Sequence, residues 1–131
     1  MKRIAILLVT LLALVEFGSA QRFTQLWRVD AGHPRFPNAS DTYRGGAYNP
    51  VTDRYLVATR TPATSILVLN AGTGAIVDSL NVSIVTGGTL PIVDIEVTSA
   101  GVIYATNLVL NTGADTTFKI YRWENQTAVP T

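Results

Sequence analysis

The sequence predicts an all-β protein made of antiparallel four-stranded meanders, arranged as two propeller-like blades of which the second is incomplete. The main observation is an internal repeat, because residues 43–82 and 92–131 share one order of strands and turns. A repeat of roughly 40–50 residues made only of strands and turns has the size of a propeller blade. The clearest matches are Arg54-Tyr-Leu-Val-Ala-Thr-Arg60 with Gly101-Val-Ile-Tyr-Ala-Thr-Asn107, and Ser65-Ile-Leu-Val-Leu-Asn70 with Phe118-Lys-Ile-Tyr-Arg-Trp123.

Residues 1–20 have the features of a secretory signal peptide. The basic pair Lys2 and Arg3 precedes an apolar run over residues 4–15, and Gly18-Ser-Ala20 supplies the small residues of a cleavage site. The alternative is a membrane anchor, but the apolar run is shorter than the roughly 20 residues that a spanning helix needs. We therefore expect a secreted, periplasmic or cell-surface protein with no membrane span after cleavage.

The composition excludes several classes of function. Removal of residues 1–20 leaves eight basic and eight acidic side chains, with no cluster of Lys and Arg to follow a nucleic-acid backbone. The chain contains no cysteine, which excludes thiol nucleophiles, iron–sulfur clusters and cysteine zinc sites. Because small exported eukaryotic domains usually rely on disulfides, the absence of cysteine suggests a bacterial protein. We expect no cofactor and no nucleic-acid partner.

The mature chain is expected to contain three parts. Residues 21–42 form a lead strand and loop, in which residues 23–29 alternate between two faces. Residues 43–91 form the first blade and residues 92–131 the second. Glycines 45 and 46 allow close approach of a neighbouring backbone, and the Asn-, Asp- and Gly-rich segments between strands predict turns. Strands are expected over residues 45–48, 55–60, 65–70, 75–82, 93–98, 102–107 and 118–124.

Two blades cannot close a ring, since closed propellers typically have about four to eight. The fourth strand of the second blade is expected to begin at Pro130-Thr131. Repeat units depend on their neighbours to bury their faces. We therefore expect an N-terminal piece of a longer protein, or one that needs partners. The alternative is a complete, open two-sheet domain.

The motif order resembles an uncharacterised family of exported bacterial proteins. The resemblance implies a propeller-like fold within a longer secreted or surface protein, and it assigns no catalytic residues. Asp94 and Glu96 depart from the more apolar pattern of that family, so a site built on them would be particular to this chain. The segments that carry the resemblance are Arg44-Gly-Gly-Ala-Tyr-Asn-Pro50, Ile66-Leu-Val-Leu-Asn-Ala-Gly-Thr-Gly74, Gly87-Gly-Thr89, Ile103-Tyr-Ala-Thr-Asn-Leu108 and Phe118-Lys-Ile-Tyr-Arg-Trp123 through Ala128-Val-Pro130.

Asp94 and Glu96 are weak candidates for catalysis. They lie two residues apart on an expected strand, so both point to one face while Val93, Ile95 and Val97 point to the other. Such a pair could serve as acid and nucleophile in glycoside cleavage, or could bind Ca²⁺. The simpler interpretation, which we favour, is the solvated polar face of an open sheet.

Tyr121 and Trp123 are weak candidates for ligand binding. They share one face of an expected strand, where aromatic rings could stack on sugars, although packing between blades is the more common role. His33, the single histidine, has no motif around it to supply a nucleophile or a metal partner. Gly72-Thr-Gly74 lacks the lysine and helix of a phosphate-binding loop and predicts a hairpin turn.

The sequence supports two function hypotheses. The first is an exported, non-catalytic module that binds a protein or glycan at the cell surface, or acts as a scaffold, because the repeats carry no convergent catalytic set. The second is a propeller-type enzyme acting on glycans or lactones with Asp94 and Glu96. A third possibility is association between chains through unpaired blades.

Overall fold

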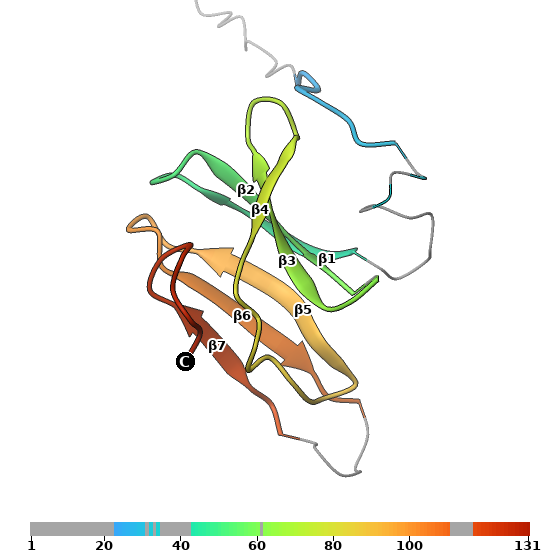
Figure 1. Ribbon diagram of the computed structural model, residues 1–131, viewed down its shortest axis with the longest axis vertical. Helices are drawn as coiled ribbons and strands as arrows, with labels where there is room; N and C mark the ends of the chain where they lie inside the picture. The colour runs from blue at the N-terminus through green and yellow to red at the C-terminus, as the bar shows by residue number, and fades with distance from the viewer. Residues whose placement is uncertain (1–22, 31, 33, 35–42, 61, 111–116) are drawn as a thin grey trace, which may run out of the picture.

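The computed structural model describes residues 23–30, 32, 34, 43–60, 62–110 and 117–131. Within these residues the chain forms a four-stranded and a three-stranded antiparallel sheet, one above the other in Figure 1. The predicted all-β class with antiparallel meanders is confirmed. The predicted signal peptide and His33 lie outside the described residues.

The first sheet is a meander of four strands, as the sequence predicts. Asparagines begin both tight turns at one end of this sheet. Asn49 Oδ1 accepts the amide of Val51 at 3.0 Å, and Asn70 Oδ1 accepts the amide of Gly72 at 3.0 Å. Side chains that bond two residues ahead stabilise such turns, which explains their location. In order across the sheet, the strands are β1 (Tyr43–Asn49), β2 (Arg54–Thr59), β3 (Ser65–Asn70) and β4 (Ile76–Ser79).

The second sheet repeats the first three strands of this plan, with β5 (Leu90–Val97), β6 (Ile103–Leu108) and β7 (Ile120–Trp123) side by side. Beyond β7 the chain returns to it. The amide of Arg122 donates to the carbonyl of Thr131 at 3.0 Å, and the amide of Thr131 donates back to the carbonyl of Arg122 at 2.9 Å. Two residues that exchange both backbone hydrogen bonds form an antiparallel pair.

The strand pairing gives a different alignment of the third strands of the two sheets from the one given by the sequence repeat. Leu56 pairs with Val68 in the first sheet, and Ile103 pairs with Trp123 in the second. The sequence repeat aligns Leu56 with Ile103, as the pairing does. It aligns Val68 with Tyr121, however, whereas by pairing the equivalent residue is Trp123, two positions later. An even shift leaves every side chain on its predicted face, because side chains alternate with period two along a strand. By the same register, the Arg122–Thr131 pair corresponds to Leu67–Ser79 between β3 and β4.

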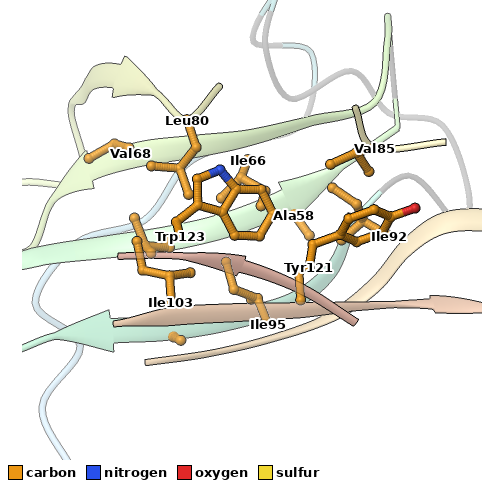
Figure 2. Close-up of a cluster of buried hydrophobic side chains, with 13 residues drawn as sticks. Ala58, Ile66, Val68, Leu80, Val85, Ile92, Ile95, Ile103, Tyr121 and Trp123 are labelled. Atoms are coloured by element: carbon orange, nitrogen blue, oxygen red, sulfur yellow. The ribbon is translucent and has the colours of Figure 1, made fainter. Parts of the chain in front are cut away.

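The two sheets pack face to face around one hydrophobic core (Figure 2). Trp123 lies between them, and Leu80 and Val85 from the segment after β4 fill the same space. Full burial of each large apolar side chain contributes roughly 1.5–3 kcal/mol. The expected stacking of tandem sheets is therefore confirmed. The core consists of Ala47, Leu56, Ala58, Ile66, Val68, Leu80, Val85, Ile92, Ile95, Ile103, Ala105, Tyr121 and Trp123.

The equivalent first strands, β1 and β5, approach each other closely at Gly45. A Cβ atom built on Gly45 would lie 3.0 Å from the Cα of Asp94 and 3.0 Å from the amide nitrogen of Ile95. Gly45 also has a φ of +56°, in the left-handed region that favours glycine. The predicted role of this glycine in close backbone approach is confirmed.

Two local predictions are wrong. Residues 23–30 contain no strand, although residues 23–29 alternate in polarity. Alternation identifies a face that can be buried, but a strand also needs a neighbour with which to share backbone hydrogen bonds. In β5, the register shifts between Leu90 and Asp94, so Ile92 and Ile95 both reach the core. Such an irregularity lets two residues three apart share one face. Contrary to the prediction, Val93 does not share the core-facing side of Ile95.

Candidate functional site

Asp94 and Glu96 lie on the same face of β5, as predicted, and both are exposed. Ile95 between them points into the core. Asp94 Oδ1 accepts the amide of Ile95 at 2.9 Å, so one carboxylate oxygen already has a local partner. The pair therefore stands on an open sheet face, where water solvates both carboxylates.

A row of polar side chains crosses this face of the second sheet. Glu96 pairs with Tyr104 in register, and Tyr104 pairs with Arg122. Arg122 Nε donates to the Tyr104 hydroxyl at 3.3 Å, and Arg122 also forms an ion pair with Glu124. The hydrogen bond to Tyr104, and then the bond to Glu124, raise the pKa of Arg122 above its usual value. The charges on this face thus have neighbours of their own, as on a solvated polar surface.

Tyr121 and Trp123 lie in the core rather than on a binding surface, with 4% and 0% of their surfaces exposed. The Tyr121 hydroxyl donates to the carbonyl of Thr86 at 2.6 Å, and Trp123 Nε1 donates to the carbonyl of Asn81 at 2.7 Å. Both rings therefore anchor the segment between the sheets. This burial agrees with packing between the sheets, the more common role for such rings, because alternation places the rings on one face without telling which face is covered.

The glycines at 72 and 74 form the β3–β4 turn, as predicted. The amide of Gly74 donates to the carbonyl of Asn70 at 2.8 Å, and the amide of Asn70 donates to the carbonyl of Ala75 at 2.8 Å. Among the described residues, no group of three or more His, Cys, Asp or Glu side chains could hold a metal ion.

A pocket of about 620 Å³ opens on the face of the first sheet that points away from the second. Tyr48 and Tyr55 form its floor, since they are opposite each other across β1 and β2 and lie on the face opposite to Ala47 and Leu56. A segment of the chain before β1 supplies another wall. The lining residues are Gln25, Leu26, Trp27, Tyr48, Asp53, Tyr55, Ala71 and Gly72.

Trp27 is fixed at this pocket by three contacts. Its Nε1 donates to the carbonyl of Ala71 at 2.7 Å. Its ring meets Tyr55 edge-to-face, with 6.3 Å between centroids and 72° between planes. A Cβ atom on Gly74 would lie 2.5 Å from the ring, so only glycine leaves room for Trp27 there. The first sheet thus holds the indole in one orientation.

Tyr48 and Asp53 provide the polar rim of the pocket. The Tyr48 hydroxyl donates to Asp53 Oδ1 at 3.1 Å. This hydrogen bond, together with desolvation and the nearby negative charge, raises the pKa of Tyr48 above its usual value. Asp53 has a φ of +50°, a left-handed conformation that Asp tolerates better than most side chains. The β1–β2 turn therefore presents its carboxylate beside the aromatic rings.

Sequence reasoning missed this pocket. A signal was present, since two tyrosines flank the Asn49–Asp53 turn at Tyr48 and Tyr55. Their pairing follows from the hairpin register alone. The position of Trp27 could not be predicted in this way, because its partner Ala71 is 44 residues away.

No helix in the described part of the chain has the length and apolar character needed to cross a bilayer.

Comparison with known proteins gives one informative similarity. No protein-family model matches the chain, and no curated protein does. The crystal structure of a DUF4623 family protein from Bacteroides eggerthii DSM 20697 matches with a TM-score of 0.53 at 29% sequence identity. The match covers 71% of this chain and 22% of that chain. The chain is therefore similar to part of a bacterial protein from a family of unknown function, and spans just over a fifth of its length.

Proposed function

We propose that this chain forms two successive blades of a propeller-like domain in a longer exported protein, and that the domain binds or presents partners without catalysing a reaction. The observation that carries the proposal is the pairing of Thr131 with Arg122. Thr131 pairs with Arg122 of β7 as Ser79 of β4 pairs with Leu67 of β3, so Thr131 lies where a fourth strand would run beside β7.

The outer face of the second sheet supports the same proposal. Ile120 is 60% exposed there, and Tyr104 is 36% exposed. In an array of blades each face packs on the next unit, which would remove the apolar surface of these two side chains from water. The similar Bacteroides protein, of which the chain covers 22%, has the length to supply further units.

The test compares the mature chain with a version that extends along its natural reading frame beyond Thr131. The extended protein is expected to unfold at a higher temperature and to bind less of a dye that reports exposed apolar surface. Equal thermal stability and equal dye binding in both would contradict the proposed array.

The enzyme alternative depends on Asp94 and Glu96, which lie two residues apart on one exposed face. The double variant Asp94→Asn/Glu96→Gln, made in the longest available protein, separates the two functions. Turnover of glycans or lactones that disappears in this variant would support the enzyme. The non-catalytic proposal expects no turnover of these substrates by the unaltered protein.

Export is part of the proposal and rests on the signal-like residues 1–20. Mass spectrometry of the protein recovered outside the cytoplasm is expected to give an N-terminus at Gln21. Recovery of the uncleaved chain from the cytoplasm alone would contradict it.

A further inference from the structure

We infer that the pocket between Trp27 and the Tyr48–Tyr55 pair binds a neutral sugar unit. The inference rests on the proposed binding role, but it does not depend on how many blades the domain has. It assigns a ligand class and a location to that role.

The aromatic walls provide the first part of the argument. Tyr48 and Tyr55 are neighbours across β1 and β2, and Trp27 stands at 72° to Tyr55. A pyranose ring with equatorial hydroxyls has two faces made of C–H groups, which pack against aromatic rings. Trp27 is already held by its hydrogen bond to Ala71, so little side-chain freedom is lost on binding.

The polar groups at the rim match the hydroxyls of a sugar. Asp53 Oδ1 accepts from the Tyr48 hydroxyl, and an ionised carboxylate retains further acceptor sites on both oxygens. Gln25 lines the same pocket with an amide that both donates and accepts. Neighbouring hydroxyls on a sugar need both kinds of partner.

Size and charge narrow the ligand class. A pocket of about 620 Å³ falls within the roughly 300–1,000 Å³ typical of small-molecule sites, and is far larger than a methylated ammonium group requires. The Asp53 carboxylate disfavours acidic sugars by repulsion between like charges. Asp53 is the one carboxylate among the lining residues, whereas glycoside cleavage normally uses two, so binding without hydrolysis is expected.

The location also favours a small ligand over a neighbouring sheet. The β1–β2 turn contributes Asp53 and the β3–β4 turn contributes Ala71 and Gly72, so the pocket opens at the turn end of the first sheet. The segment with Trp27 already covers part of this face. A further sheet packed over the pocket would abolish sugar binding in a longer protein, and this is one outcome of the test.

The test is a titration of the ¹⁵N-labelled mature chain followed by NMR. The two tryptophans give separate indole signals, one from the pocket and one from the core, and Trp27→Phe assigns them. Cellobiose or chitobiose is expected to shift the Trp27 signal in a saturable way and to leave the Trp123 signal unchanged. The titration is repeated with tetramethylammonium chloride, with digalacturonic acid and with the protein extended beyond Thr131.

Each outcome decides a different point. Saturation by tetramethylammonium but by neither sugar would overturn the sugar inference and leave the binding role standing. Absence of saturation with every probe would remove the pocket from that role. Release of monosaccharide during the titration would instead contradict the non-catalytic function. Binding by the mature chain that disappears in the extended protein would show that another sheet occupies the pocket.

Variants locate the site. Tyr48→Ala and Asp53→Asn are each expected to weaken sugar binding by roughly fivefold to tenfold. Asn tolerates the left-handed conformation of Asp53, so the turn is preserved. Tyr104→Ala, which removes a partly exposed tyrosine from the second sheet, is the matched control and is expected to bind normally. Unchanged affinity in both pocket variants would overturn the inference.

Discussion

Gly45 lies so close to Asp94 that a methyl group on Gly45 would stand 3.0 Å from the Asp94 Cα atom. The contact joins β1 to β5, which are the corresponding first strands of the two sheets. Side chains would keep these backbones apart, so the stacking of the sheets depends on a position without a Cβ atom.

The variant Gly45→Ala is expected to lower the free energy of unfolding by about 2–3 kcal/mol, because it adds the left-handed cost of a Cβ atom to overpacking against β5. Urea denaturation measures the change. Gly72→Ala is the matched control, since its new Cβ atom would meet nothing closer than 3.5 Å, and we expect a change within about 0.5 kcal/mol. Equal stability of the two variants would contradict the close approach.

Asn107, near the end of β6, binds the residues just before β7. Its Oδ1 accepts the amide of Lys119 at 2.8 Å, and its Nδ2 donates to the carbonyl of Thr117 at 2.9 Å. Asn107→Ala leaves these backbone groups without their partner, and is expected to destabilise the protein by about 1–3 kcal/mol. Asn125→Ala, at an exposed turn, is the control with an expected loss well below that of Asn107→Ala. Thermal unfolding of both variants would reveal the difference.

Trp123 is fully buried and is hydrogen-bonded to the segment between the sheets. Trp123→Phe removes part of the ring and the partner of the Asn81 carbonyl, so we expect a loss of about 2–4 kcal/mol. Ile120→Ala, three residues earlier on the exposed face, is expected to change stability by about 0.5 kcal/mol or less. Calorimetry that finds the same loss for both would contradict the assignment of faces on β7.

Tyr48 is expected to lose its proton at a higher pH than an unperturbed tyrosine, since its hydroxyl donates to Asp53. A raised folded-state pKa of a tyrosine favours the neutral form. The hydrogen bond therefore stabilises the fold below the unfolded-state pKa, and this contribution is lost as pH rises through the folded-state pKa.

The measurement is a spectrophotometric titration of tyrosinate, in which subtraction of Tyr48→Phe isolates Tyr48. Asp53→Asn is expected to move the pKa of Tyr48 down toward its usual value. A titration curve for Tyr48 that is identical with and without the Asp53 carboxylate would show that the hydrogen bond is absent in solution.

The strands and turns could be predicted because the signals for them are local. Asn49 and Asn70 bond to backbone groups two residues away, and the Asn-, Asp- and Gly-rich turns also mark where the strands between them begin and end. The role of Gly45 could also be predicted, since a glycine inside a strand often marks close backbone approach.

The candidate site could not be predicted because it depends on which face is covered by distant parts of the chain. Alternation placed Tyr121 and Trp123 together, but the covering residues Asn81 and Thr86 come from the preceding segment. Trp27 reaches Ala71 across 44 residues for the same reason. The strand predicted over residues 23–29 is absent for a different reason. Its residues alternate in polarity, but no strand in the described part of the chain pairs with them.

The two-residue offset between the third strands of the two sheets bears on how such a chain can diverge after duplication. Because the displacement is even, the copy keeps its inward-pointing residues pointing inward while the preceding connection gains length. A repeated strand can therefore shift by two residues while its core-facing side chains stay in the core. A shift by an odd number of residues would move every core-facing side chain of the strand to the solvent face.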